Sequence, residues 1–370
     1  MSGYFLYHSI GTYAAKEAEL GAILRDFASA WAAPGDAQWN AVLGLKQQFI
    51  ESWAQLIGAH ASQIALTANV TTGLYSIMGS LPEEYLRGRT VLVAQDCFPS
   101  LHFLLQKLAG RFGFALRTVA LRPGMAYVRD EDFIEVWDDS VGLALLTWVS
   151  STTSHRIDLQ SLTETARRHR SLVALDITQG AGIVPFQVCD DIAFTLSASL
   201  KWVCGVPGAC ILHARADMLA RCEPEYRGWF SQEDPFSWGL DRFRYAPDAR
   251  RFDNGTPSVL GGIGSLPGIR YVLDRGVAAL RDQNLALGSI ILDYAQARGW
   301  ELLTPHAEAQ RGGSLMLRAA SAQAAGALVE ALRGQELYCD HRAAVLRLSP
   351  GNVTAEADVI RLCEALKAAL

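Results

Sequence analysis

From about residue 64, short apolar runs rich in β-branched residues alternate with stretches whose apolar residues recur every three or four positions. The first pattern is typical of buried strands and the second of helices. Strands that alternate with helices need crossover connections, which favour an α/β fold with a mostly parallel sheet. The predicted strands are IALTA (64–68), RTVLVAQ (89–95), ALRTVAL (115–121), GLALLTWV (142–149), LVALD (172–176), IAFTLS (192–197) and ACILHA (209–214).

The rest of the chain follows other patterns. Residues 222–257 are rich in Pro, Gly, Arg and aromatics, and an irregular segment of this length usually serves function or an interface. Beyond residue 258, helical and strand-like stretches alternate as in a small α+β domain. The predicted division is an N-terminal segment (1–40) packed on the functional site or the small domain, a large domain (41–260) and a small C-terminal domain (261–370).

Composition narrows the class of protein. The formal net charge is -5 without any block of like charges, unlike a nucleic-acid-binding surface. The longest apolar runs are too short to span a bilayer, and the first residues lack the pattern of a secretory signal. Seven cysteines without a CxxC pair favour reduced thiols over disulfides or zinc. We therefore predict a cytoplasmic enzyme that binds no membrane, nucleic acid or metal.

One lysine, Lys201, stands in the apolar stretch TLSASLKWVCGVPGACIL (195–212), with no charged residue within nine positions. The other lysines lie in helical patterns, where we expect their side chains to face water. These are Lys16, Lys46, Lys107 and Lys367.

Asp176 ends the predicted strand 172–176, and open α/β sheets bind ligands at the carboxyl ends of their strands. A buried carboxylate needs a cationic partner. Pyridoxal phosphate offers its protonated pyridine nitrogen to an aspartate and its aldehyde to a lysine, so Asp176 and Lys201 explain each other. The alternative is an aspartate that caps a turn and a surface lysine, which would explain either residue alone equally well.

Other stretches could complete such a site. In TANVTTGLYSI (67–77) a strand leads into a helix whose free N–H groups and hydroxyls suit a phosphate, although threonine is also a common helix cap. Phe98, on a turn before Pro99, could lie on a flat ring or belong to the core. Arg347, within an apolar strand, suits a substrate carboxylate or a structural salt bridge. GGIGSLPG (261–268) mimics a dinucleotide motif but does not follow a strand.

Together these stretches resemble the fold type I pyridoxal-phosphate enzymes of the class V aminotransferase superfamily, and kynureninase in particular. The resemblance spans nearly the whole chain and implies a large domain with a mostly parallel seven-stranded sheet plus a small C-terminal α+β domain. The motifs that carry it are HSIG (8–11), NVTTGL (69–74), FPS (98–100), DITQ (176–179), SLK (199–201), RGWF (227–230), GTPS (255–258), RGGSLML (311–317) and CDHRAAVLRLSP (339–350).

The resemblance also implies roles for single residues. Lys201 would form the Schiff base, Asp176 would pair with the pyridine nitrogen, and Gln179 would lie beside the cofactor hydroxyl; these are the predicted catalytic residues. Phe98 would stack on the ring. The other implied contacts are Val70, Thr71 and Ser199 at the phosphate, Trp229 and Thr256 from the second subunit of a homodimer, Arg347 at the substrate carboxylate, and His8 and Ser9 at the border of the substrate pocket.

Several positions depart from kynureninase. That family has His at position 179, Tyr at position 200 and Asp at position 101, where this chain has Gln179, Leu200 and Leu101. The motif similar to GWFGH becomes GWFSQ (228–232). Gln179 resembles the glutamine of cysteine desulfurases, but those enzymes need a nucleophilic cysteine on a small-domain loop, and Cys339 lies in a stretch that matches kynureninase.

We therefore predict a pyridoxal-phosphate enzyme that acts on a small α-amino acid other than kynurenine, through a Lys201 aldimine and removal of the α-proton. Transamination and β-cleavage both stay open, with His102 and His8 as candidate acids. One alternative is a true kynureninase that hydrolyses kynurenine or 3-hydroxykynurenine. The others are a catalytically silent homologue used as a binding module and a generic nucleotide-binding α/β protein.

Overall fold

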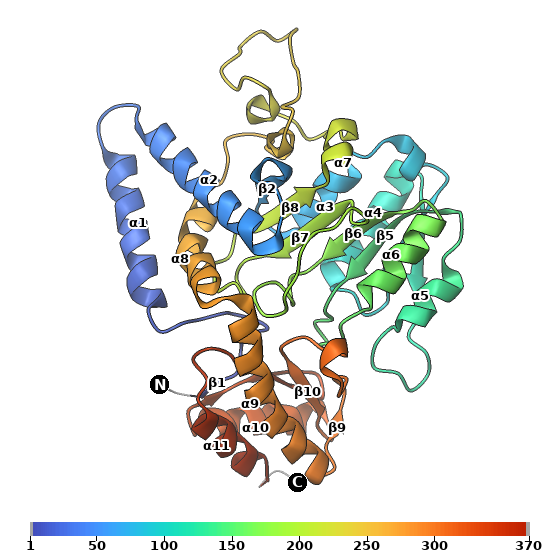
Figure 1. Ribbon diagram of the computed structural model, residues 1–370, viewed down its shortest axis with the longest axis vertical. Coiled ribbons are helices and arrows are strands. Elements are labelled where there is room, and N and C mark those ends of the chain that lie inside the picture. Colours follow the sequence, from blue (N-terminus) through green and yellow to red (C-terminus); the bar gives the residue numbers. More distant parts are fainter. Residues whose placement is uncertain (1–2, 368–370) are drawn as a thin grey trace.

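The computed structural model describes residues 3–367, and its largest feature is a seven-stranded sheet (Figure 1). β8 is antiparallel to both of its neighbours and the other pairs are parallel, which confirms the predicted mostly parallel sheet. In spatial order the strands are β2 (Ile64–Thr67), β8 (Cys210–Ala214), β7 (Phe194–Ala198), β6 (Leu172–Asp176), β5 (Val141–Thr147), β3 (Thr90–Ala94) and β4 (Ala115–Val119).

Helices cover both faces of this sheet, as the continuous apolar strands predict. Successive side chains of a strand point to opposite faces. In β3, Leu92 therefore packs with the core under one helical layer, and Val91 and Val93 pack with the core under the other. The first layer contains α2 (Gln38–Ile57), α5 (Asp130–Val136), α6 (Leu159–Arg168) and α8 (Leu260–Arg275), and the second contains α3 (Val70–Met78), α4 (Pro99–Phe112) and α7 (Ala216–Arg221).

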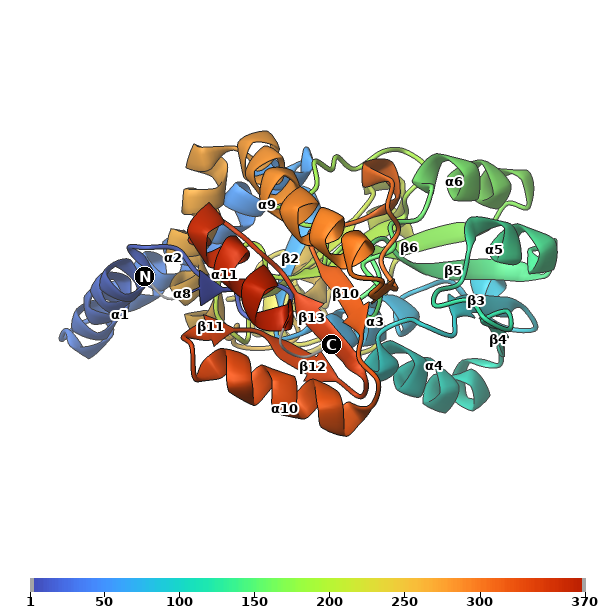
Figure 2. The same ribbon diagram turned by 90° about the horizontal axis from the view of Figure 1, so that it is seen from below.

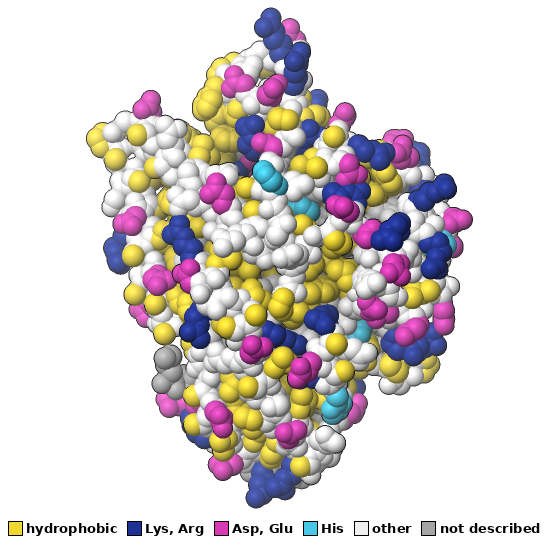
Figure 3. All heavy atoms as spheres, viewed as in Figure 1, with side chains coloured by type: hydrophobic (Ala, Val, Ile, Leu, Met, Phe, Trp, Pro, Cys, Tyr) yellow, Lys and Arg dark blue, Asp and Glu magenta, His cyan; other side chains and the backbone are white. Residues whose placement is uncertain are grey.

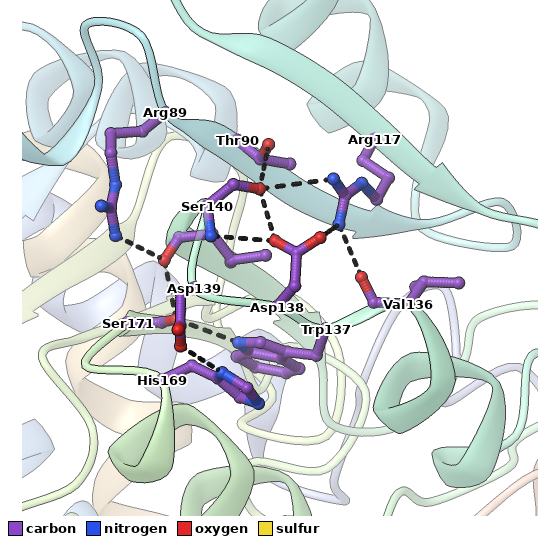
Figure 4. Close-up of polar contacts among 11 residues, drawn as sticks. Arg89, Thr90, Arg117, Val136, Trp137, Asp138, Asp139, Ser140, His169 and Ser171 are labelled. Carbon is purple, nitrogen blue, oxygen red and sulfur yellow. Dashed lines mark hydrogen bonds and ion pairs between the residues drawn. The ribbon is translucent and has the colours of Figure 1, made fainter.

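Side-chain hydrogen bonds link the middle of β4 to the segment before β5 and to the start of β3 (Figure 4). Arg117 of β4 donates through Nη1 to Asp138 Oδ2 at 2.9 Å. The hydroxyl groups of Ser140, just before β5, and Thr90, at the start of β3, lie 2.9 Å apart. These contacts stabilise the sheet on the side where its strands begin. The cavity described below lies at the carboxyl ends of the strands.

The C-terminal part, from residue 277 onward, builds a second, antiparallel sheet in the order β12-β13-β10-β9. Figure 2 shows its three long helices around this sheet. The elements are α9 (Val277–Ala297), β9 (Glu301–Leu302), β10 (Leu315–Arg318), α10 (Ala322–Arg333), β11 (Leu337–Tyr338), β12 (Asp340–Arg342), β13 (Val345–Leu348) and α11 (Glu356–Lys367).

The beginning of the chain joins this C-terminal part. β1 (Gly3–Tyr4) pairs in parallel with β11, and Phe5 is fully buried in the C-terminal core. The chain then crosses to the large sheet, where α1 (Lys16–Ala32) packs on α8. The predicted domain boundaries after residues 40 and 260 stay predictions.

The expectation that the other lysines face water is wrong for Lys46, and it fails in part for the half-buried Lys16, whose amine donates to two backbone oxygens. The Lys46 side chain is only 8 % exposed and forms an ion pair with the buried carboxylate of Asp253. Lys46 lies one helical turn from Val42, Phe49 and Ile50, on the buried face of α2. Its partner belongs to the irregular segment 222–257, so the helical pattern alone could not reveal the pair.

The irregular segment 222–257 contains only two short 3₁₀ turns, η3 (Trp229–Ser231) and η4 (Ala249–Phe252). Its middle projects from the top of the molecule in Figure 1. The side chains there are exposed although they are large and apolar: Phe236 by 64 %, Trp238 by 79 % and Leu240 fully.

No helix among residues 3–367 is long and apolar enough to cross a membrane. All seven cysteines are free, and Cys189 alone among them is exposed. Over the face in Figure 3, acidic and basic side chains are interspersed. The predicted cytoplasmic location stays a prediction.

Candidate active site

A cavity of about 770 Å³ lies at the carboxyl ends of β5, β6 and β7, where the C-terminal part and the N-terminal segment meet the large sheet. Parallel strands bring residues far apart in the sequence to this one edge. Of the predicted site residues, the cavity is lined by His8, Ser9, Val70, Thr71, Phe98, Asp176, Gln179, Lys201 and Arg347.

Lys201 lies in the loop after β7, and its amine stands 5.7 Å from the centre of the Phe98 ring. Burial lowers the pKa of Lys201 to about 8; the Asp176 carboxylate opposes this shift, and Arg347 and Arg342 add to it. About a tenth of the Lys201 amine is therefore neutral at pH 7, far more than for an exposed lysine.

Asp176 ends β6 and is almost fully buried. Its Oδ1 accepts hydrogen bonds from the Thr178 backbone N–H at 2.9 Å and hydroxyl at 2.5 Å. Burial raises the pKa of Asp176, while the Thr178 hydrogen bonds and the Lys201 charge oppose the rise. Oδ2 has no hydrogen-bond partner among residues 3–367, so this oxygen is available to a ligand.

The N-terminus of α3 forms another part of the wall. Asn69 caps this helix, because its Oδ1 accepts from the Thr72 N–H at 2.8 Å and the Thr72 hydroxyl at 3.0 Å. Val70, Thr71 and Thr72 all line the cavity. A helix N-terminus presents free N–H groups and a partial positive charge, which suit an anion such as a phosphate.

Three buried polar atoms of the cavity wall have no hydrogen-bond partner among residues 3–367: Thr147 Oγ1, Ser151 Oγ and Gln179 Oε1. Buried polar groups without partners are rare in folded proteins. Three unpartnered polar atoms around one cavity are what a binding site for a polar ligand requires. Sequence reasoning identified Gln179 and missed Thr147 and Ser151, which carry no signal beyond their place near the end of β5.

The N-terminal segment closes one side of the cavity. Gln179 donates through Nε2 to the His8 backbone oxygen at 3.1 Å, and the Gly11 N–H donates to the Leu200 oxygen at 2.8 Å. A Cβ on Gly11 would stand only 1.7 Å from the Lys201 carbonyl oxygen. Position 11 must therefore be glycine for this segment to lie against the lysine loop.

The hairpin of β12 and β13 forms the adjoining wall. Arg347 donates through Nε and Nη2 to the two carboxylate oxygens of Asp340, at 2.7 and 2.5 Å. His8 Nε2 lies 2.9 Å from Asp340 Oδ1. Burial acts to raise the pKa of Asp340, but the hydrogen bonds from His8 and Arg347 outweigh it and lower the pKa to about 2. The salt-bridge alternative for Arg347 is therefore present, and the same residue also lines the cavity.

The remaining predicted residues lie outside the lining of this cavity. Ser199 is fully buried, and its hydroxyl accepts from the Trp53 indole N–H at 3.2 Å. Trp229 packs edge-on against Trp39 and Phe230. Thr256 lines a smaller cavity of about 150 Å³ that shares Ala68 and Thr72 with the first one. The predicted roles of Ser199, Trp229 and Thr256 stay predictions.

The two candidate acids differ in position. His102 hydrogen-bonds the Thr118 hydroxyl at 3.0 Å and lies outside the cavity lining, whereas His8 lines the cavity. The side chain of His8 is held between Ser349 Oγ, at 2.6 Å, and Asp340. Burial lowers the pKa of His8, although Asp340 opposes the shift, so the imidazole is neutral near neutral pH.

Sequence reasoning missed Asp340 and Arg342. In the antiparallel hairpin, Asp340 stands opposite Arg347 and Arg342 stands opposite Val345. Residues two apart on a strand share a face, so Asp340, Arg342 and Arg347 all face the same side. The two-residue spacing of Asp340 and Arg342 before a two-residue turn was the available signal.

The mostly parallel sheet, the separate C-terminal sheet and a buried lysine and aspartate at the strand ends define an α/β enzyme of fold type I. The protein-family model for class V aminotransferases matches residues 44–347. The chain therefore belongs to the class V aminotransferase family, whose members are enzymes that use pyridoxal phosphate.

Individual relatives agree with this assignment. A kynureninase of Deinococcus radiodurans is 29% identical over 292 residues, which cover 76% of this chain and 68% of the relative. An uncharacterized aminotransferase of Bacillus subtilis is 24% identical, with 84% of this chain and 80% of the relative covered. The apo structure of a cysteine desulfurase from Thermococcus onnurineus superposes with a TM-score of 0.86 at 17% identity, covering 99% of this chain and 94% of that one, and so shares the fold.

Proposed function

We propose that this enzyme acts on a small α-amino acid other than kynurenine, by transamination or by β-cleavage. The observation that carries the proposal is the joint position of Lys201 and Asp176 in one cavity. Leu101 and Leu200 also line this cavity, at the positions where kynureninases carry polar side chains.

The residues present fit pyridoxal phosphate. Lys201 would bond to the cofactor aldehyde, and the unpartnered Oδ2 of Asp176 would face the pyridine nitrogen. Phe98 would cover the ring, and the start of α3 at Val70 and Thr71 would hold the phosphate. The orphaned Gln179 Oε1 supports a polar ligand at that position. When bound, the cofactor supplies an electron sink for the carbanion that forms at the substrate α-carbon.

The protein groups then have separable tasks. Once the substrate amine has taken its place on the aldehyde, the freed amine of Lys201 would remove the proton from the substrate α-carbon, because its lowered pKa leaves it partly unprotonated at neutral pH. Asp176 keeps a proton on the pyridine nitrogen by remaining ionised beside it. Arg347 orients the substrate carboxylate, and the N-terminal segment at His8 and Ser9 excludes water from that side.

A true kynureninase is the second candidate, and the similarity to the Deinococcus radiodurans kynureninase favours it. The apolar side chains of Leu101 and Leu200 argue against it. A hydrophobic side chain cannot hold or donate a proton at the β- or γ-position, and His8 is the one predicted acid that lines the cavity.

We expect the holoenzyme to convert at least one small amino acid at least tenfold faster than kynurenine. Mixing the holoenzyme with a panel of amino acids, kynurenine and 3-hydroxykynurenine included, tests this expectation. Cofactor absorbance reports reaction and mass spectrometry identifies the products. A keto acid that keeps every substituent of the substrate side chain, with the cofactor in its pyridoxamine form, indicates transamination, and an amino acid or keto acid that has lost the group on its β-carbon indicates β-cleavage. Rapid release of alanine and an anthranilate from kynurenine would refute the proposal.

We also propose that the active unit is a homodimer in which Trp229 and Thr256 reach the partner's site. The exposed Phe236, Trp238 and Leu240 support this, because apolar patches on projecting segments commonly mark protein interfaces. In sedimentation we expect a dimer that Trp238→Asp converts to monomer with weaker cofactor binding. The control Ile360→Asp, at a 46 % exposed position on α11, should stay dimeric. A wild-type monomer with native cofactor affinity would contradict this proposal.

A further inference from the structure

Two arginines of the cavity wall lie near a single carboxylate, and only one of them pairs with it. Arg342 and Arg347 both line the cavity and project from the same face of the β12–β13 hairpin. Arg347 is engaged through Nε and Nη2 with both oxygens of Asp340. Arg342 forms no side-chain hydrogen bond and no ion pair with any residue in the described range 3–367, so its whole guanidinium fork is available.

Arg342 lines the cavity with an exposed side chain, and its guanidinium contacts no carboxylate of residues 3–367. Partial burial lowers the pKa of Arg342, the positive charge of Arg347 lowers it further, and Asp340 opposes these effects. Asp176 is the one acidic residue among those that line the cavity, and it belongs to the Lys201 end. Asp340 therefore acts on Arg342 only from a distance, while both of its oxygens bond to Arg347.

A substrate whose single carboxylate binds at Arg347 would leave the Arg342 guanidinium without an anion in contact. We propose, building on the proposed function, that Arg342 binds a second anionic group, so that the preferred substrate is an α-amino acid with a side-chain carboxylate or an acid of similar shape. A guanidinium fork binds a carboxylate through two parallel hydrogen bonds, which gives geometric selectivity as well as affinity. Arg342 then determines specificity, and Arg347 takes the α-carboxylate.

The proposal predicts a specific change in selectivity. The wild-type holoenzyme should bind aspartate or glutamate more tightly than asparagine or glutamine, as measured by titration of the cofactor absorbance. Arg342→Gln should lower affinity for the acidic amino acids by roughly 10- to 100-fold, the range for a lost charged hydrogen-bonded pair. Affinity for asparagine and glutamine should change less than threefold. Arg342→Lys keeps the charge but not the guanidinium fork, so its affinity for the acidic amino acids should lie between those of the wild type and Arg342→Gln.

Calorimetry with succinate and butyrate provides a readout that needs no reaction. Wild-type holoenzyme should favour succinate, and Arg342→Gln should lose that preference. Arg168→Gln is a matched control, because Arg168 is exposed on α6 and lies outside the cavity. Thermal melting of each variant checks that it is folded.

Other results would overturn the assignment. An equal loss of affinity for acidic and neutral amino acids would place the α-carboxylate on Arg342. Weaker pyridoxal-phosphate binding by Arg342→Gln, with unchanged selectivity, would place the cofactor phosphate there. A wild-type protein without preference for succinate over butyrate would also refute it. If the cofactor binds but no amino acid alters its absorbance, the proposed function fails, and the succinate comparison still decides the role of Arg342.

Discussion

Replacing Lys201 by alanine is expected to abolish covalent attachment of pyridoxal phosphate and to slow turnover by roughly 10²- to 10⁴-fold, the range for loss of a positioned acid–base group. Lys201 is the one lysine that lines the cavity in the described part of the chain, and its amine stands over Phe98. No other amine is in place to bond the aldehyde or to remove the α-proton.

The measurement combines absorbance with trapping. Wild-type holoenzyme treated with borohydride should retain the cofactor on the peptide that contains Lys201, as found by mass spectrometry. Lys201→Ala should retain none. Lys107→Ala is the matched control, because Lys107 is exposed on α4 outside the cavity and should behave as wild type. Trapping on any other lysine, or an active Lys201→Ala enzyme, would contradict the assignment.

Replacing Lys46 by methionine is expected to lower the free energy of unfolding by about 3–5 kcal/mol, the range for breaking a buried ion pair on one side. Both side chains of the Lys46–Asp253 pair are almost fully buried. Methionine fills a similar volume, so the loss comes from the uncompensated Asp253 carboxyl and not from a cavity. Urea denaturation at pH 7 measures the change.

The pH dependence of the lost stability identifies the unpaired Asp253 carboxyl as its cause. Burial raises the pKa of Asp253, and the Lys46 charge opposes that rise. Without Lys46, Asp253 stays protonated in the folded protein. In the unfolded chain the same aspartate has its ordinary pKa and loses its proton as the pH rises above that value. The stability deficit of Lys46→Met should therefore grow as pH rises from about 4 towards 7. A deficit that is constant over this range would contradict the explanation.

Two further variants act as controls. Removing both charges in Lys46→Met/Asp253→Leu should recover most of the lost stability, since no buried charge is left alone. Arg87→Ala should leave the denaturation midpoint nearly unchanged, because the Arg87–Glu83 pair is 63 % and 75 % exposed.

The large sheet could be predicted because its strands are buried on both faces and so form distinct apolar runs between helical stretches. All seven predicted runs are strands in the structure. Lys201 and Asp176 could be predicted for a related reason, because a charged residue that stands alone at the end of an apolar strand, or soon after it, is easily recognised in the sequence. Their meeting in one cavity follows from the parallel topology.

What escaped prediction depends on partners distant in sequence. β1 and β11 have two residues each, too few to show any periodicity. Lys46 lies in an otherwise ordinary amphipathic helix, and only the position of Asp253 makes it a buried ion pair. The position of Arg342 on the same face as Arg347 could not be predicted, because the register of a short hairpin decides which side chains share a face.

The pairing of Gly3 with Leu337 has a consequence for the order of folding. During synthesis, the first residues emerge long before the strand and the hydrophobic core that they complete. Contacts between such distant parts of a chain form late, since a long loop must first be closed. His8 and Ser9 follow the same strand into the catalytic cavity. We therefore expect a newly made chain to acquire its large sheet first and its competence for catalysis last, when the N-terminal strand docks.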